Sequence, residues 1–373
     1  MYDLIIIGGG PAGTAAAIAA ARAQLRVLLL ERGRFPRHKV CGEFVSAEAL
    51  GLLSSLMRGC PEGEAVLSGA LRVNCARLFA DGSEARVSIS PSAASIPRFQ
   101  LDAALWRSAQ VAGCDCRQQV EVLACQPPGA ATPSEAAPFE VTTNSGIFRA
   151  RSVVDASGRW SRLRNMPTSE PQRFRKQPDW LGLKAHYKTG ATDAHEQTTD
   201  LYFFEGGYCG VQPVGEGELN VCAMTRSTVA TDLTDVFALQ PLLRERSRGL
   251  TQLTEAVATS PLIFREPTPE RDGILCVGDA AGFIDPFAGD GISLALRSGT
   301  AAATALADFC HGVITLKQAV RRYRETYELS FAPAFRAAAR LRRLLAMPRF
   351  ARGLVLQLLQ TRAFAQYVLR TTR

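Results

Sequence analysis

Near its N-terminus the chain reads Leu4-Ile5-Ile6-Ile7-Gly8-Gly9-Gly10-Pro11-Ala12-Gly13. The apolar run indicates a buried strand, and the alanine-rich residues from Thr14 to Arg22 indicate the helix that follows it. Glycines between a strand and a helix let the backbone approach a pyrophosphate, whose negative charge the helix N-terminus favours. These residues predict an α/β fold that begins with a dinucleotide-binding turn.

A second strand and an acidic residue strengthen this prediction. Val27-Leu28-Leu29-Leu30 indicates another buried strand, and Glu31 ends it 18 residues after Gly13. An acidic side chain at this distance can accept a hydrogen bond from a ribose hydroxyl, and this context is what makes a G-x-G-x-x-G motif specific. The predicted dinucleotide-binding residues of this unit are Gly8, Gly10, Ala12, Gly13, Glu31 and Arg32.

A second glycine-rich loop lies far along the chain, at Gly278-Asp279-Ala280-Ala281-Gly282. The turn Arg271-Asp272-Gly273 and the apolar run Ile274 to Val277 predict a strand that delivers this loop at its carboxyl end, where open α/β sheets bind ligands. We expect the Asp279 carboxylate to accept a hydrogen bond from a hydroxyl of the ligand, and a helix to begin near Ile292, where its N-terminus can stabilise negative charge on that ligand. The predicted ligand-binding residues here are Gly278, Asp279, Pro286, Gly289, Gly291 and Ile292.

With these two loops the chain resembles the FAD-dependent oxidoreductases that include aromatic hydroxylases, geranylgeranyl reductases and flavin-dependent halogenases. The segment from Asp155 to Arg164, which contains Gly158, is similar to the D-[AG]-x-G-x-x-S-x-x-R element of that superfamily. The resemblance implies that this element binds FAD and, in hydroxylases, nicotinamide. It also implies that Arg98 approaches the flavin; the alternative is a surface ion pair between Arg98 and Asp102.

The resemblance implies an α/β fold in which a Rossmann-like FAD-binding domain is interleaved with an antiparallel-sheet substrate domain and followed by a C-terminal helical segment. Residues 1–65, 98–170 and 266–320 are assigned to the FAD-binding domain. Residues 66–97 and 171–265 are assigned to the substrate-binding sheet domain, because their short alternating stretches are typical of strands. Residues 321–373 form the predicted basic C-terminal helices.

The segment Lys39-Val40-Cys41-Gly42 bears most directly on the reaction. It resembles the K-x-C-G of geranylgeranyl reductases, which implies that Cys41 approaches the flavin, and Lys39, Cys41 and Gly42 are the predicted catalytic residues. A thiol can supply the proton that reduction of an alkene requires. The alternative is that Cys41 is only a small residue packed beside the ring. Both interpretations remain open.

The segment Gly207 to Pro213 separates the related activities less clearly. It keeps Gly207, Tyr208 and Pro213 of the G-Y-x-W-x-F-P found in prenyl reductases, but Gly210 and Gln212 replace its two large aromatic residues. The W-x-W-x-I-P signature of halogenases is absent from it. The segment therefore leaves the identity of the substrate open.

Three functions follow from these patterns. The first is an FAD-dependent reductase or dehydrogenase acting on a C=C bond of an isoprenoid- or polyketide-like hydrophobic small molecule. The second is a monooxygenase that hydroxylates an aromatic or polyketide substrate. The third is a flavin electron-transfer protein at a membrane. In each case FAD is the predicted cofactor. NAD(P)H is the predicted transient electron donor, unless a partner reductase delivers the electrons.

The charge of the chain is concentrated at its C-terminal end. The whole chain carries +8, whereas residues 321–373 contain twelve arginines and only Glu325 and Glu328 as acids, which gives +10. Apolar residues recur there at helical spacing, so these helices either cap the fold or lie on an anionic membrane surface. Since no nucleic-acid-binding motif accompanies the arginines, we expect no nucleic-acid partner.

The remaining features predict a cytoplasmic protein without a metal site. The first strand begins directly after Met1, which leaves no room for a signal peptide, and no long apolar run suggests a membrane span. The basic tail keeps peripheral contact with the inner face of a membrane open. Ten cysteines show neither zinc-ligand spacing nor a disulfide pattern suited to that compartment, so we expect free thiols.

Overall fold

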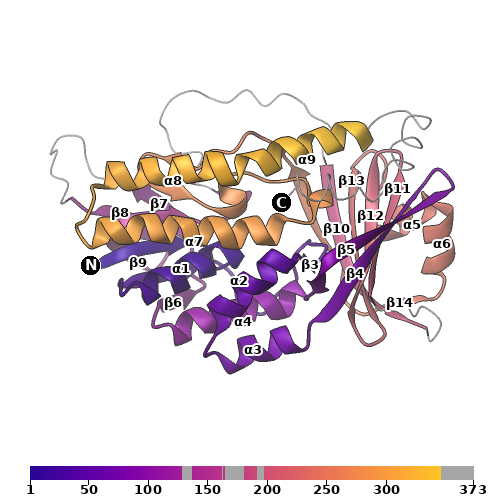
Figure 1. Ribbon diagram of the computed structural model, residues 1–373, viewed down its shortest axis with the longest axis horizontal. Helices are drawn as coiled ribbons and strands as arrows, with labels where there is room; N and C mark the ends of the chain where they lie inside the picture. Colours follow the sequence, from indigo (N-terminus) through magenta and orange to yellow (C-terminus); the bar gives the residue numbers. More distant parts are fainter. Residues whose placement is uncertain (128–136, 162, 164–179, 191–196, 346–373) are drawn as a thin grey trace.

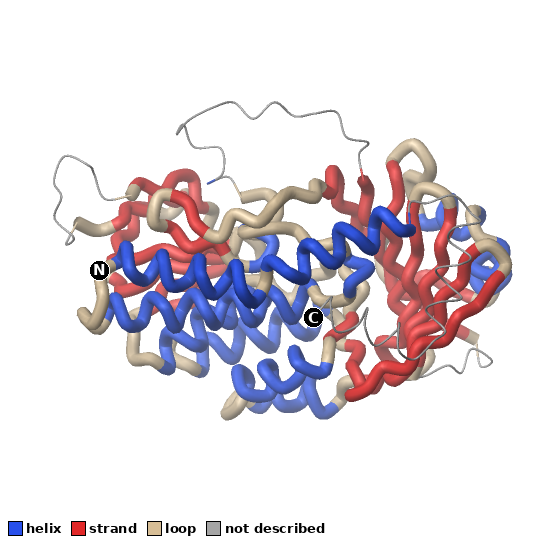
Figure 2. The backbone as a smooth tube through the Cα atoms, turned by 45° about the horizontal axis from the view of Figure 1, so that its top comes forward, coloured by secondary structure: helices blue, strands red, loops and turns tan. Residues whose placement is uncertain are grey.

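A computed structural model of the chain describes residues 1–127, 137–161, 163, 180–190 and 197–345. Figure 1 shows an elongated molecule in which a first β-sheet and its helices occupy the left and a second sheet occupies the right. Figure 2, in which strands are red, shows the same two groups of strands from another side, with helices packed along the first group.

The first sheet contains the predicted β-α-β start, which is confirmed. Leu4 of β1 pairs in parallel with Val27 of β2 and with Ser152 of β9, and the strand order is β16-β17-β9-β1-β2-β6. The elements are β1 (Tyr2–Ile7), α1 (Pro11–Arg22), β2 (Val27–Glu31), β6 (Asp115–Gln118), β9 (Gly146–Asp155), β16 (Glu270–Arg271) and β17 (Ile274–Cys276).

Both faces of this sheet are buried, which explains why its central strands are continuous apolar runs. Leu4, Ile6 and Leu29 pack under α1, α4 (Arg98–Val111) and α7 (Gly291–Cys310). Ile5 and Leu28 point the other way, into a core closed by β7 (Val122–Gln126) and β8 (Phe139–Thr143). A tight turn joins β8 to β9, because the chain reverses there to cover the sheet.

Helices α1 and α7 pack unusually closely beside the first glycine loop. A Cβ atom added to Gly299 of α7 would lie 2.1 Å from the Ala12 carbonyl oxygen. Such an approach is possible only for residues without bulk at the crossing, and α1 is correspondingly rich in alanine. The packing fixes the start of α1 against α7, whose own N-terminus follows the second glycine loop.

The second sheet is largely antiparallel, as the short strand patterns predict. Its order is β14-β10-β13-β12-β11-β4-β5-β3, and β15 also pairs with β10. The predicted turn at Asp81-Gly82 joins β4 to β5, and both of its residues have positive φ. The strands are β3 (Phe44–Val45), β4 (Leu71–Ala80), β5 (Ser83–Ser95), β10 (Trp180–Thr189), β11 (Thr198–Phe204), β12 (Gly207–Gly215), β13 (Glu218–Arg226), β14 (Leu250–Gln252) and β15 (Val257–Leu262).

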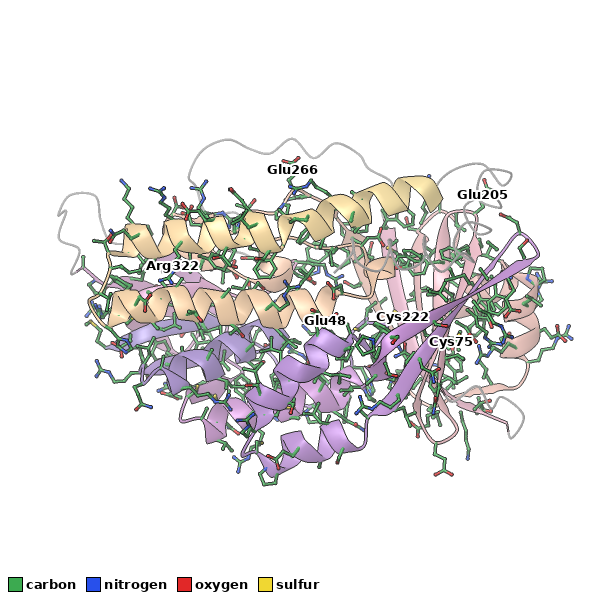
Figure 3. The ribbon with its side chains drawn as sticks, in the orientation of Figure 1. Glu48, Cys75, Glu205, Cys222, Glu266 and Arg322 are labelled. Atoms are coloured by element: carbon green, nitrogen blue, oxygen red, sulfur yellow. The ribbon has the colours of Figure 1, made fainter. Side chains whose placement is uncertain are left out.

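The two faces of the second sheet differ in chemistry. Leu183, Ala185 and Val221 alternate onto the outer face, where they pack with α5 (Leu233–Ala238) and α6 (Pro241–Ser247). The opposite face of the same central strands carries polar side chains: Lys184 and His186 from β10, Gln212 from β12, and Asn220 and Cys222 from β13. Cys222 lies on the side of this sheet that faces the first sheet and its helices (Figure 3).

The last described helices lie beside the helices of the first sheet, and the second of them extends toward the second sheet (Figure 1). In Figure 1, α8 (Leu316–Ser330) runs beside α7, and α9 (Ala332–Leu345) follows it. Three buried residues of this region belong to the apolar core that contains α1 and α7: Phe331, Ala334 and Ala338. The hydroxyl of Tyr323 donates to the Cys276 carbonyl oxygen at 2.8 Å. Up to Leu345 these helices therefore cap the fold; residues 346–373 lie outside the described part. No helix of the described residues is long and apolar enough to cross a membrane.

Candidate active site

The first glycine loop follows the carboxyl end of β1 and fits only glycine at two positions. Gly8 has φ of +109°, and a Cβ atom there would lie 2.3 Å from the Ala156 carbonyl oxygen. At Gly13 a Cβ atom would lie 1.8 Å from the carbonyl oxygen of Gly8. These contacts are within the protein itself, so Gly8 and Gly13 shape the turn.

Gly10 differs from its neighbours because it faces open space. No atom of the described residues lies within 4 Å of a Cβ atom added there. Gly10 precedes α1, whose N-terminus has no side-chain cap from the described residues and no acidic residue in its first turn. Exposed amides at an uncapped helix N-terminus form an anion site, so the residues present fit the pyrophosphate of a dinucleotide.

Glu31 ends β2 beside this loop and is buried. Its Oε2 accepts from the Gly9 amide at 2.9 Å, and its Oε1 accepts from the Gly33 amide at 2.7 Å and contacts the Arg37 guanidinium at 2.9 Å. Burial opposes ionisation, but these partners, Arg37 foremost, lower the pKa of Glu31 below its usual value. An ionised carboxylate has about four lone-pair sites, so Glu31 retains the capacity to accept from a ribose hydroxyl.

The loop after β9 is organised by Asp155. Its Oδ1 accepts from the Ser157 amide at 3.0 Å and from the Ser157 hydroxyl at 2.5 Å, and its Oδ2 accepts from the Ser161 hydroxyl at 2.6 Å. Gly158 has φ of +82°, which allows this turn. The structure thus gives Asp155 a positioning role in its own loop, and direct contact with a cofactor stays a prediction. Arg164 lies outside the described residues.

The second glycine loop lies against the start of α1, directly after the first glycine loop. A Cβ atom at Gly278 would lie 2.9 Å from the Ala12 Cβ, and the Gly278 amide donates to the Ser298 hydroxyl at 2.9 Å. The Asp279 carboxylate is 3.8 Å from the Arg159 guanidinium and is partly exposed. Helix α7 begins at Gly291, so the predicted start near Ile292 is confirmed.

The turn before α7 brings this loop to the second sheet. The exposed Pro286 opens the short helix η3 (Pro286–Ala288), and Gly289 has φ of +67°. A Cβ atom at Gly289 would lie 3.2 Å from the Phe44 ring of β3. The turn at residues 285–291 and the segment that contains Cys41 are therefore neighbours at the boundary between the sheets.

Arg98 and Cys41 lie in contact at this boundary. Arg98 forms a bidentate ion pair with Asp102, in which both nitrogen–oxygen distances are 2.7 Å. The side chains of Arg98 and Asp102 are 12% and 0% exposed, so the alternative of a surface pair is wrong: the ion pair forms, but residues that pack around the start of α4 exclude water from it. The Cys41 thiol is close enough to the guanidinium to influence the pKa of Arg98. Contact between Arg98 and the flavin stays a prediction.

A buried ionic cluster adjoins Cys41, and we call Glu43, Lys184 and His186 the Glu43 cluster. Glu43 Oε1 accepts from Lys184 Nζ and from the Arg98 amide, the latter at 2.8 Å, and Oε2 is 2.8 Å from His186 Nε2. All three side chains are nearly inaccessible to water. Burial opposes the charge, but His186 and then Lys184 lower the pKa of Glu43 below its usual value.

Three of the remaining predicted site residues are exposed, unlike the Glu43 cluster: Lys39, Gly42 and Arg32. Lys39 is exposed, and desolvation followed by the charges of Arg98 and Arg37 lowers its pKa. Gly42 faces open space, with no atom of the described residues within 4 Å of an added Cβ. The side chain of Arg32 is exposed.

Sequence reasoning missed the Glu43 cluster. His186 and His38 read as scattered residues, but their rings lie 5.3 Å apart and nearly perpendicular. A signal was present: Leu181-Gly182-Leu183-Lys184-Ala185-His186-Tyr187 alternates, with both basic residues on the face opposite the leucines. Nothing local connects that strand to Glu43, which is 141 residues away from Lys184.

Comparisons with known proteins agree with this geometry. The family described as FAD binding domain matches residues 1–340. The digeranylgeranylglycerophospholipid reductase 2 of Methanopyrus kandleri is 28% identical over 350 residues, which cover 90% of this chain and 85% of that protein. The menaquinone reductase of Mycobacterium tuberculosis is 26% identical over 371 residues, which cover 93% of this chain and 85% of that protein.

Among solved structures, the flavin-dependent brominase Bmp2 superimposes with a TM-score of 0.80. The superposition covers 100% of this chain and 93% of that protein at 22% sequence identity, so it shows a shared fold. FAD is the cofactor that the matched family binds. A nicotinamide donor and a partner reductase stay predictions.

Proposed function

The chain belongs to the FAD binding domain family and is an FAD-dependent oxidoreductase, and on this premise we propose that it reduces a carbon–carbon double bond in a hydrophobic substrate. The observation that carries the proposal is the Cys41 thiol. It lies against the Arg98 guanidinium, in the segment that joins the first sheet to the second. An acid at this position is what the reduction of an alkene needs in addition to electrons.

When reduced, FAD supplies a hydride, and with it both electrons, to one carbon of the double bond. The other carbon must then take a proton, and in this proposal the Cys41 thiol donates it. The electron pair of the broken S–H bond stays on sulfur, so the product is saturated and Cys41 is left as a thiolate.

Arg98 favours this role for Cys41. Burial opposes the charge of Arg98, but Asp102 raises its pKa above the usual range, so the guanidinium remains positive. The guanidinium of Arg98 is therefore a fixed positive charge near the sulfur atom that loses its proton in this step. The amide of Glu43 supports the same product, since it donates to Cys41 Sγ at 3.3 Å.

The side chains near the turn at residues 285–291 support a hydrophobic substrate. The rings of Phe203 and Tyr208 pack edge-on against Phe287, with centroids 5.4 and 5.9 Å away. Phe264 and Phe283 stack beside them and are only partly buried. Both relatives named above reduce lipids or quinones according to their names. We therefore place isoprenoid-like substrates before polyketide-like ones.

The proposal is tested with FAD-loaded protein that is reduced anaerobically with dithionite, so that no natural electron donor is required. The probes are digeranylgeranylglycerophospholipid and menaquinone, and products are read by mass spectrometry in H₂O and in D₂O. We expect saturated product that carries two solvent-derived deuterium atoms per reduced bond in D₂O, because dithionite supplies only electrons and the transferred hydride takes its hydrogen from solvent as well. Cys41→Ala should lower the rate by roughly 10²–10⁴-fold while FAD binding is retained.

Two outcomes would contradict the proposal. If Cys41→Ala turns over at the wild-type rate, Cys41 is a packing residue and not the proton donor. If the probes are unchanged without air but gain oxygen or a halogen when air and halide are supplied, the enzyme is a monooxygenase or a halogenase.

A further inference from the structure

We propose that the Arg37 guanidinium binds the pyrophosphate of FAD, together with the N-terminus of α1. The inference goes beyond the proposed function, because it concerns how the chain holds its cofactor and not which bond the enzyme reduces. Arg37 belongs to the segment from Arg32 to Lys39, which follows β2, leads to Cys41, and contains four cationic residues and no acidic one.

Two contacts bring Arg37 to the first glycine loop. Its Nη1 atom is 2.9 Å from Glu31 Oε1, while the other oxygen of the same carboxylate accepts from the Gly9 amide at 2.9 Å. The guanidinium carbon also lies 4.9 Å from the centroid of the Phe35 ring. A Cβ atom added to Gly9 would lie 3.1 Å from that ring, so both partners of the arginine themselves touch the loop. Arg37 is therefore held beside Gly9 by a carboxylate and an aromatic ring.

The loop leaves room for a ligand at the next residue. Gly10 faces open space, and the N-terminus of α1 that follows it has no side-chain cap among the described residues. The amides of such a helix end bind a phosphate group, but they carry only partial positive charge. An arginine adds a full charge and a planar fork of N–H donors that matches a pair of phosphate oxygens. The two groups therefore complement each other at a pyrophosphate.

The protein leaves much of the donor capacity of Arg37 unused. Within the described ranges its polar partner is Glu31, although every nitrogen of a guanidinium is a hydrogen-bond donor. Its buried Nε atom has no hydrogen-bond partner there. Buried polar atoms almost always have a partner, so an unpaired one calls for a group that the chain itself does not supply. The side chain is 27% exposed, which gives a ligand access to the guanidinium.

The charges around Arg37 also favour an anion. The Glu31 carboxylate balances the charge of Arg37. In the same way Asp102 balances Arg98, but Lys39 has no ion pair in the part of the chain that the structure describes. Desolvation, followed by the charges of Arg98 and Arg37, lowers the pKa of Lys39. This group of side chains thus carries a surplus of positive charge, and the negative charge of a pyrophosphate relieves the repulsion.

The test compares FAD, ADP and adenosine as ligands of the full-length chain freed of FAD, with dissociation constants from calorimetric titration and, for adenosine, from competition. ADP carries a pyrophosphate without the flavin, and adenosine lacks both. We expect Arg37→Gln to raise the dissociation constants of FAD and ADP roughly tenfold or more, the effect of a lost charge-assisted hydrogen bond, and to leave that of adenosine unchanged. The control is Arg34→Gln, which removes an exposed cation of the same segment and should bind every ligand as the wild type does.

Gly33 offers a way to displace the guanidinium without removing its charge. A Cβ atom at Gly33 would lie 1.8 Å from Arg37 Nη1, so the flexible arginine side chain has to move away. Gly33→Ala should therefore weaken the binding of FAD and ADP on its own but add little to Arg37→Gln, a non-additive pair. Arg37→Lys keeps the charge but not the planar fork, and its affinities should lie between those of the wild type and Arg37→Gln.

Thermal unfolding shows whether each variant is folded. Wild-type affinity for ADP in folded Arg37→Gln overturns the inference; if that variant does not fold, wild-type affinity for ADP in folded Gly33→Ala does so. An equal loss of affinity for ADP and adenosine also overturns it, because Arg37 then acts only by holding Glu31 for a ribose.

NAD(P)H contains a pyrophosphate as well, and the titrations separate the two dinucleotides. If Arg37→Gln binds FAD and ADP normally but the FAD-loaded variant binds NADPH more weakly than the wild type, the guanidinium serves the electron donor and the inference is wrong. None of these assays contains a reducible substrate. Their failure therefore leaves the role proposed for Cys41 standing, and a wild-type rate in Cys41→Ala leaves this inference standing.

Discussion

The two sheets of the molecule contain similar numbers of strands but contribute to the candidate site in different ways. Both faces of the first sheet are buried under apolar residues, so it offers a ligand only the ends of its strands. The second sheet buries one apolar face under α5 and α6 and turns a polar face toward the first sheet. The first sheet positions loops, and the second supplies side chains.

This difference shows where each kind of function is encoded. At the ends of β1 and β17, glycines remove bulk so that backbone approaches backbone and leaves room for a cofactor. On the second sheet, Lys184 and His186 come from the strand itself, and their partner Glu43 reaches them from another segment. Backbone geometry therefore shapes the glycine loops of the first sheet, whereas buried charged side chains shape the site at the second sheet.

The largest expected effect is the loss of stability when the buried carboxylate of Glu43 is removed. Replacing Glu43 by leucine leaves Lys184 and His186 buried without their partner, and breaking such a pair costs about 3–5 kcal/mol. The free energy of unfolding of Glu43→Leu, measured with urea, should be lower than that of the wild type by this amount. The free energy of unfolding of Glu43→Gln should be lowered less. The matched control is Glu325→Ala, which removes an exposed partner of Arg321 on α8 and should leave stability nearly unchanged. A Glu43→Leu variant as stable as the wild type would show that the cluster is not a structural ion pair.

The next effect compares two glycines of the same loop. Gly13→Ala places a Cβ atom 1.8 Å from the Gly8 carbonyl oxygen and should destabilise the protein by about 1–3 kcal/mol. Gly10→Ala adds a Cβ atom to open space, so stability without FAD should be unchanged while FAD affinity falls. Urea unfolding and fluorescence titration with FAD measure the two quantities separately. Equal effects of both substitutions on stability would contradict this division of roles.

The smallest expected effect is the pH dependence of the buried charge. Because the folded state lowers the pKa of Glu43 below its ordinary value of 4.5, this carboxylate stabilises the protein above about pH 4.5. That contribution is lost as the pH falls through the lower value of the folded state. The stability difference between wild type and Glu43→Gln should therefore be constant near neutral pH and narrow in acid, as measured by urea unfolding at several pH values. A difference that grows below pH 4.5 would reverse the assigned sign.

A third pair of residues shows how strongly burial changes one sequence spacing. Arg98 and Asp102 are four residues apart on α4, and Arg321 and Glu325 are four residues apart on α8. The first pair is almost completely buried and contacts Cys41, whereas the second is exposed to water. Both pairs consist of an arginine followed four residues later by an acidic residue, so the sequence spacing does not predict which pair is buried.

The amino-acid sequence alone determined the strand–turn–helix units, the two glycine-rich turns and the strands of the second sheet. It could do so because each rests on local patterns: apolar runs, alternation, and glycines at turns. It also identified Cys41 through its neighbours in the chain.

Only the tertiary structure decided what surrounds Cys41. Glu43 meets Lys184 and His186 across 141 and 143 residues of chain, and Asn220 reaches Cys41 across 179. Whether a charged residue is buried, and beside which partner, depends on how distant segments pack, and periodicity carries no information about that. The cofactor-binding turn was therefore readable from one segment of the chain, while the chemistry beside it required the whole fold.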